Sequence, residues 1–346
     1  MKNDVILKAC RREKTPFTPI WLMRQAGRYM EEYRKIRENY SFIEMCKNPE
    51  IACEVTLQPI KKIPLDAAII FADILLPLEG MGIDFYFGKN EGPVIKNPIR
   101  TTHDVERIKI IEPENDVPYL LKAIKLVKKE LNGKIPLIGF SGAPFTLASY
   151  MIEGGHSRNY AKTKIMMYNE PKAWHKMMDK LAEIIIRYLS AQIESGVDLV
   201  QLFDSWVGCL SENDYREFVM PHSQKIFKAV KKLNIPSIHF GTGNSHLLEL
   251  MKKAGGDVTG IDWRINLGDA WEKLGKDTAI QGNLDPTALF ARPDEIKKRT
   301  KEILALADNR PGHIFNLGHG ILQGTPVENV ILLANTVHEY SRSNDS

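Results

Sequence analysis

Four arginines that follow one apolar run near the start of the chain have the most informative side chains in the sequence. They are Arg24, Arg28, Arg34 and Arg37, and the run before them, Pro19 to Met23, is rich in residues that favour strands. Guanidinium groups are planar forks that pair bidentately with carboxylate or phosphate. Several of them at the end of one strand therefore predict an anionic ligand with more than one acidic group.

The same arginines could instead lie on a solvated helix over residues 29–40 and pair with the three glutamates in it. Such pairs, three or four residues apart, are common in helices, so we favour this interpretation for Arg34. Arg24 and Arg28 come before the acidic residues, and Gly27 between them leaves room for the close approach of a ligand. We therefore expect these two to bind an anion.

Two further candidates, Asp73 and His319, stand where apolar runs end. Asp73 follows the run 69–72, which places a carboxylate in an otherwise apolar context. The sequence supports equally well that it caps a short helix beginning at Ile74. His319 lies between two glycines, whose missing side chains permit a tight turn and expose the imidazole. This favours a functional histidine over a core one.

Several familiar catalytic and metal-binding motifs are absent. The sequence has no Gly-x-x-x-x-Gly-Lys phosphate loop, no Gly-x-Ser-x-Gly elbow and no His-Glu-x-x-His, and the pair Gly241 and Gly243 is weak evidence for phosphate binding. The nine histidines show no close ligand spacing, so no metal is predicted. The four cysteines form no C-x-x-C pair, which supports neither a disulfide framework nor a zinc ribbon.

Composition restricts the class of partner. The 346 residues are 43% hydrophobic and 26% charged, and the net charge of +4 is too mild to indicate nucleic acid. No window holds the roughly 20 apolar residues that a membrane helix needs. The first residues lack the long apolar region of a signal peptide. With its cysteines unpaired, we expect a cytoplasmic protein.

Eight apolar segments, nearly all separated by segments with helical periodicity, must position these residues. They are residues 19–23, 64–71, 135–140, 197–203, 235–240, 258–261, 278–281 and 313–317. This alternation predicts the α/β class and a (β/α)8 TIM barrel, whose near-continuous apolar strands form a parallel sheet covered on both faces. We expect one domain over residues 1–346, with an excursion at about 78–101 that contains a hairpin. The segment 44–62 should be a helix interrupted near Pro49 and Pro59.

In such a barrel the site lies at the carboxyl ends of the strands. The polar residues found there include Arg24 with Gln25, Asp73, Ser141, Asp204 with Ser205, His239, Asp262 with Trp263, Asn283, Asp285, Asn316 and His319. On residue type alone, Ser205 reads as a helix cap, Tyr150 as a core aromatic residue and Phe140 as barrel packing.

Four motifs resemble a known family. They are Trp21 to Tyr29, Gly139 to Leu147, Gln281 to Pro286 and Asn316 to Gly320, and they closely resemble uroporphyrinogen decarboxylase. The likeness runs from about residue 19 to residue 338. The chain departs from the family pattern at residues 30–32 (Met-Glu-Glu) and 323–324 (Gln-Gly), away from the candidate site residues.

The resemblance implies a (β/α)8 barrel and a decarboxylase without cofactor or metal. Its substrate would be an acidic tetrapyrrole, uroporphyrinogen, whose four acetate side chains become methyl groups. The resemblance also implies a homodimer. By correspondence, the substrate-binding residues are Arg24, Gln25, Arg28, Arg37, Asp73, Phe140, Tyr150, Ser205 and His319, and the catalytic ones are Asp73, Arg37, Tyr150 and His319.

The chemistry is consistent with an ionised Asp73, because a fixed carboxylate in an apolar cleft can bond pyrrole N–H groups and stabilise a cationic ring. The proton donor stays open. The family pattern nominates Arg37, yet a guanidinium is a poor acid near neutral pH. Tyr150, His319 and a substrate carboxyl group are the competitors.

Two rival functions remain. Zinc-dependent methyltransferases of the same fold need a His-x-Cys pair and a later cysteine. Here the pair would be His239 with Gly241, and no cysteine follows Cys209. The other rival is a non-catalytic tetrapyrrole-binding protein, against which the presence of Asp73 beside the arginine cluster argues.

Overall fold

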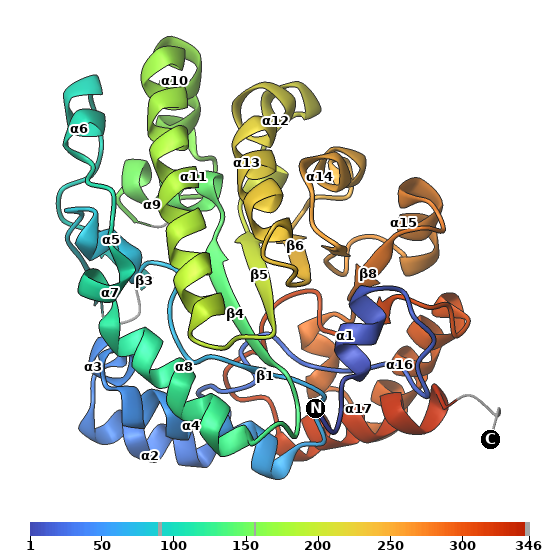
Figure 1. Ribbon diagram of the computed structural model, residues 1–346. Coiled ribbons are helices and arrows are strands. Elements are labelled where there is room, and N and C mark those ends of the chain that lie inside the picture. The colour runs from blue at the N-terminus through green and yellow to red at the C-terminus, as the bar shows by residue number, and fades with distance from the viewer. Residues whose placement is uncertain (89–91, 156, 343–346) are drawn as a thin grey trace.

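A curled parallel sheet forms the centre of the computed structural model, which describes residues 1–88, 92–155 and 157–342 (Figure 1). Seven strands pair in parallel in the order β1-β4-β5-β6-β7-β8-β9. They are β1 (Ala68–Ile69), β4 (Leu137–Gly142), β5 (Leu199–Asp204), β6 (Ser237–Gly241), β7 (Val258–Gly260), β8 (Ala279–Gln281) and β9 (His313–Ile314).

The segment around Ile20 closes this sheet into a barrel. Ile20 forms a parallel bridge with Phe315, and its carbonyl accepts a hydrogen bond of 2.8 Å from the Asp66 N–H. The segment therefore lies between β9 and β1 and bonds to both sides. It is a bridge rather than the predicted strand because the Ile20 N–H donates to the Asp66 carboxylate, at 2.8 Å, and not to a strand carbonyl. With this eighth segment the predicted (β/α)8 barrel is confirmed.

Helices surround the barrel on the outside, as Figure 1 shows. The longer ones are α4 (Pro49–Lys62), α8 (Pro118–Leu131), α9 (Pro144–Glu153), α11 (Pro171–Glu194), α13 (Met220–Lys231), α16 (Pro293–Ala307) and α17 (Val327–Tyr340). The shorter ones are α1 (Val5–Cys10), α2 (Glu31–Asn39), α3 (Phe42–Lys47), α5 (Pro77–Gly80), α6 (Thr102–Arg107), α7 (Pro113–Asp116), α10 (Ala161–Asn169), α12 (Glu212–Phe218), α14 (Leu248–Ala254) and α15 (Leu267–Leu274), with the 3-10 turns η1 (Val207–Cys209) and η2 (Pro286–Phe290).

The segment 44–62 shows how local sequence sets these boundaries. It breaks at Asn48, whose side chain accepts from the N–H groups of Glu50 and Ile51 at 3.1 and 3.0 Å and so starts α4 with Pro49 in its first position. The predicted interruption at Pro49 is confirmed. The one at Pro59 is wrong, because Pro59 lies within α4, where a proline removes a single backbone hydrogen bond without ending the helix.

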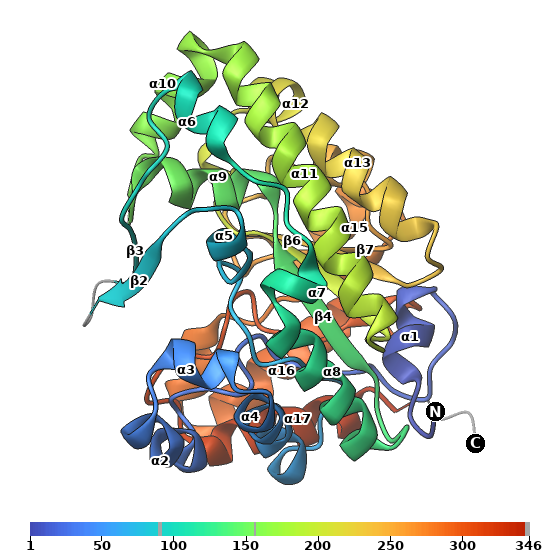
Figure 2. The same cartoon turned by 60° about the vertical axis from the view of Figure 1, so that its left-hand side comes forward.

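A short antiparallel hairpin lies in the excursion after β1, as expected. It pairs β2 (Phe85–Gly88) with β3 (Gly92–Ile95), and Figure 2 shows it projecting at one side of the barrel. Its base is tied to the barrel because the Ile95 N–H donates to the Gly154 carbonyl at 2.9 Å, and because the rings of Phe42 and Phe87 meet edge to face with centroids 5.0 Å apart. Residues 89–91 of the excursion lie outside the described part.

Polar side chains as well as aromatic ones fill the interior of the barrel. The Trp21 indole donates to Gln281 at 2.8 Å, and Gln281 donates in turn to Gln201 at 2.9 Å. Beside this ladder, Phe203 contacts Phe140 at 5.5 Å between centroids. These side chains, which we call the floor of the barrel, occupy its interior between the strands.

Candidate active site

The structure brings Arg24, Asp73, Tyr150 and His319 together at the carboxyl ends of the strands. They come from the loop after the Ile20 segment, the loop after β1, helix α9 and the loop after β9. The positive charge of Arg24 acts on the pKa values of the other three, and the charge of Asp73 acts on the pKa of Tyr150. Residues almost 300 positions apart in the sequence thus share one electrostatic environment.

Arg24 is exposed at the turn that follows the bridge segment. The backbone φ of Arg24 is 61°, in the left-handed region, which is uncommon for residues other than glycine and asparagine. In the described residues no carboxylate lies within ion-pair distance of its guanidinium. Arg24 therefore offers a full set of donors to a ligand.

Gln25 holds this turn from below. Its side chain is fully buried, accepts from the Leu22 N–H at 3.0 Å and donates to the Ala67 carbonyl at 3.1 Å. Its own carbonyl accepts from the Tyr29 hydroxyl at 2.7 Å. Both the oxygen and the nitrogen of the Gln25 side-chain amide are thus bonded to backbone groups. Gln25 therefore supports the turn that carries Arg24, and its side chain is not exposed at the surface.

Asp73 is partly exposed, and its Oδ1 accepts from the Leu75 N–H at 2.9 Å. Burial raises the pKa of this carboxyl to about 6, against the opposing effects of the Leu75 N–H and the Arg24 charge. The two sequence interpretations are therefore compatible: one oxygen caps the turn after β1, and Oδ2 has no hydrogen bond from the described residues. A strongly raised pKa is typical of functional carboxylates.

His319 is a neutral imidazole in this setting. Its Nδ1 accepts from the Gly320 N–H at 2.7 Å, which assigns the ring proton to Nε2. Burial, with the positive charges of Arg24 and Arg264, lowers the pKa of His319 to about 4, and the Asp262 carboxylate opposes this. Near neutral pH, His319 can donate a hydrogen bond from Nε2 but is not a stored proton.

Tyr150 lies on α9, close enough to Asp73 for the charge of that carboxylate to act on its pKa. Burial and the Asp73 charge raise its pKa to about 12, so the hydroxyl keeps its proton and can donate. Its ring meets the ring of Trp206 edge to face at 6.0 Å. Phe140 is buried in the floor, and the half-buried Ser205 follows β5 with its carbonyl accepting from the Thr242 hydroxyl at 2.5 Å.

The remaining arginines are placed less centrally. Arg28 is exposed, and Arg37, in the last turn of α2, donates to the Tyr40 carbonyl rather than toward Asp73. The predicted pairing of Arg34 with glutamates is wrong. Its guanidinium donates to the carbonyls of Arg28 and Tyr29 at 3.0 and 2.9 Å.

The reason lies in the competing lysines of the same region. Glu31 pairs with Lys35 at 2.8 Å, and Glu32 pairs with Lys62 of α4. A helical pattern shows which charges are three or four residues apart, but it does not show a lysine that arrives from another helix.

Of three further residues near the site, two were not candidates on residue type alone. Trp206 contacts Tyr150, Asp262 is fully buried at the end of β7, and Arg264 acts on the pKa of His319. Asp262 was visible in the sequence as a polar residue at a strand end, whereas nothing in the sequence pointed to Arg264.

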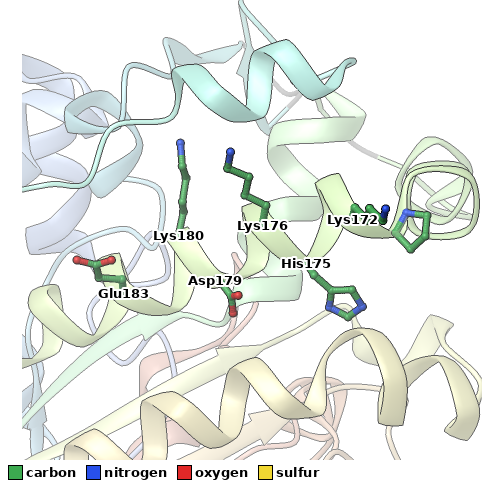
Figure 3. Close-up of a pocket in the computed structure, with 7 residues that line it drawn as sticks. Lys172, His175, Lys176, Asp179, Lys180 and Glu183 are labelled. Carbon is green, nitrogen blue, oxygen red and sulfur yellow. The ribbon is translucent and has the colours of Figure 1, made fainter.

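A groove on the outer face of α11 is a separate feature. Figure 3 shows that Lys176 and Lys180 point to one side of this helix and His175 and Asp179 to the other. The groove lies on the helical layer and not at the strand ends.

Across the three described ranges, no group of three histidine, cysteine or acidic side chains is arranged to hold a metal ion. Within the same ranges, no helix is both long and apolar enough to cross a membrane.

The fold and the site define a (β/α)8-barrel enzyme with a carboxylate and guanidinium groups gathered at the strand ends. Residues 1–340 match the family model described as "Uroporphyrinogen decarboxylase (URO-D)". Proteins named uroporphyrinogen decarboxylase from Carboxydothermus hydrogenoformans and Sorangium cellulosum are 60% and 52% identical to the chain, over 98% and 99% of it and 97% of each relative. The chain belongs to the uroporphyrinogen decarboxylase family.

A solved structure described as a methyltransferase from Methanosarcina mazei is also similar. It is 21% identical with a TM-score of 0.84, and the match covers 98% of each chain. At this identity the likeness shows a shared fold and nothing about the reaction.

Proposed function

We propose that this carboxy-lyase of porphyrin biosynthesis removes the carboxyl groups from the four acetate side chains of uroporphyrinogen and gives coproporphyrinogen, using Asp73 as its central group. Family membership supports the reaction. The observation that carries the residue assignment is that, among the described residues, Oδ2 of Asp73 receives no hydrogen bond and Arg24 has no acidic partner, while the charge of Arg24 acts on the pKa of Asp73.

The chemistry needs a place for the electrons of the breaking bond. Protonation of a pyrrole ring carbon makes the ring cationic. The bond from the acetate methylene to its carboxylate then breaks, CO2 leaves, and the electron pair moves into the ring. A proton added at the methylene carbon completes the methyl group, and loss of the ring proton restores the pyrrole. Asp73, accepting from pyrrole N–H groups, would stabilise the cation throughout.

Arg24 and Arg28 would bind the carboxylates of the substrate. Both guanidiniums are exposed, and charge-assisted hydrogen bonds to carboxylates are about twice as strong as neutral ones. Ser205, half-buried in the loop directly after β5, would add a hydrogen bond from its side chain to the substrate.

The pKa values of His319 and Tyr150 reduce the number of candidate proton donors. A histidine with a pKa of about 4 is uncharged near pH 7, so His319 would orient the substrate through Nε2–H. Tyr150, with a pKa of about 12, would act as a hydrogen-bond donor to the same substrate. Arg37 stays a candidate for the proton donor, together with a carboxyl group of the substrate.

The direct test is anaerobic incubation of the purified protein with uroporphyrinogen in the presence of a chelator, followed by separation of the products by number of carboxyl groups. Successive loss of four carboxyl groups is expected. A chelator-sensitive activity, or no product at all, contradicts the proposal.

A homodimer and a cytoplasmic location belong to the same proposal. Light scattering coupled to size-exclusion chromatography tests the first, and fractionation of cells tests the second. The zinc-methyltransferase alternative is disfavoured by the place of His239, which is buried against Phe227 with Gly241 where a thiolate would be needed. Zinc analysis of the protein checks this.

A further inference from the structure

We propose that Arg264 is an additional substrate-binding residue, which binds a carboxylate of the acidic substrate on the opposite side of His319 from Arg24. This inference rests on the proposed function. It adds a second cationic subsite to a site whose other proposed cations, Arg24 and Arg28, both follow the Ile20 segment.

The two glycines beside His319 give the geometry. A Cβ placed on Gly320 would lie 2.5 Å from Cδ of Arg24, so the Arg24 side chain lies across that glycine. A Cβ placed on Gly318 would lie 2.4 Å from the backbone nitrogen of Trp263, so the loop after β7 lies across the other. His319 is therefore held between two loops that each carry an arginine.

The Arg264 side chain is fixed from two directions. Its guanidinium carbon lies 4.1 Å from the centre of the Trp263 ring, a cation–π contact. The guanidinium also pairs with the Asp262 carboxylate, which is fully buried and accepts further from the N–H groups of Gly243 and Arg264 at 2.6 and 3.0 Å. A guanidinium held in one position loses little conformational entropy when it binds a ligand.

Enough of this guanidinium is free to bind. Only Nη1 donates to Asp262, a guanidinium has five N–H donors, and 51% of the side chain is exposed. The influence of both arginines on the pKa of His319 agrees with their places on its two sides. A substrate with carboxylates around a ring needs cations on more than one side of the site, which Arg24 and Arg28 alone do not provide.

Arg264 also borders a groove on the outer surface beside Asp269 and Glu272. A guanidinium that served only this groove would leave substrate binding unchanged. The test must therefore measure binding separately from turnover.

The test is steady-state kinetics of Arg264→Leu and Arg264→Lys with uroporphyrinogen under anaerobic conditions. Loss of one charge-assisted contact should raise KM about tenfold in the leucine variant, with kcat changed less than about twofold. The lysine variant keeps the positive charge but loses the planar, two-pronged donor geometry, so its KM should lie between the values of the wild type and the leucine variant. The matched control is Arg310→Leu, because Arg310 lies 4.9 Å over the ring of Trp271 on α15 in the same kind of contact.

Equal KM values in wild type and Arg264→Leu would overturn the inference. A loss of kcat together with a lowered melting temperature would also overturn it, because it would assign Arg264 to holding the Asp262 loop. Failure of the proposed function is distinguishable, since the wild-type protein itself would then form no product.

Discussion

The barrel mouth and the outer face of α11 both gather cationic side chains, but they use the charge differently. At the mouth, Arg24 is exposed and, in the part of the chain that is described, has no acidic partner. On α11, Lys180 donates to three backbone carbonyls at 2.9 Å and Lys176 pairs with Glu106. A cluster of like charges therefore indicates a binding site only when its donors are not already used within the fold.

The barrel mouth also holds a partly buried acid, Asp73, where the outer groove holds an exposed one, Asp179. Burial in an apolar setting raises the pKa of Asp73 to about 6. The exposed Asp179 instead pairs with Lys225 and His222, and these contacts lower the pKa of Asp179. Unpaired charge costs stability, so a fold that keeps it at the strand ends of a barrel indicates function. Four predictions test this difference.

The largest effect is expected from Asp73→Asn, which keeps the shape of the side chain and removes its charge. Loss of the stabilised cation should lower kcat by about 10²- to 10³-fold. The native pKa is raised above its unfolded value, so the ionised carboxylate costs stability above about pH 6, and asparagine removes that cost. The melting temperature at pH 7.5 should therefore not fall. Undiminished turnover would remove Asp73 from its central role.

The second prediction compares matched cations in the two regions. Arg24→Met should lower kcat/KM about 10- to 100-fold, because one charge-assisted contact to the substrate is lost. Lys176→Met on α11 should leave kcat/KM unchanged, because its partner Glu106 is exposed and the pair is on the surface. Similar losses in both variants would mean that overall charge, and not the free guanidinium, attracts the substrate.

The third prediction concerns pH. The rate of the free enzyme should fall by about tenfold per pH unit below about pH 6, as Asp73 becomes protonated. Arg24 lowers the pKa of Asp73, so Arg24→Met should move the midpoint to higher pH, and Lys176→Met should not move it. Profiles of kcat/KM for the three proteins provide the measurement. The substrate titrates equally in all of them, so a shared midpoint would exclude Asp73 as its cause.

The sequence was sufficient for the order of the barrel elements, because apolar runs of strand length alternate with helical periods. The sequence did not predict the extent of a strand where a side chain takes the place of a backbone group in the hydrogen bonding. The first strand shortens because the Asp66 carboxylate takes the Ile20 N–H, a contact between residues 46 positions apart. Such competition leaves no periodic signal.

The same limit applies to the site. Arg24, Asp73 and His319 could be named from residue type and flanking glycines, and the structure brings them together. The supporting role of Gln25 could not be predicted, because it depends on a hydrogen bond to the Ala67 carbonyl beside the next strand. Arg264 was missed because its relation to His319 depends on a loop packed against a glycine more than 50 positions away.

The smallest effect is expected from Lys180→Met in the outer groove. Lys180 donates to the carbonyls of Val105, Glu106 and Ile108, which lie at the C-terminal end of α6, where carbonyls lack partners within the helix. Methionine keeps the aliphatic stem and removes all three bonds, so unfolding in urea should show a loss of about 1 kcal/mol. The kinetic constants should stay at wild-type values, because the donors of Lys180 serve the fold alone. A change in KM without a change in stability would instead make the outer groove a second binding site, and the distinction between used and unused donors would fail.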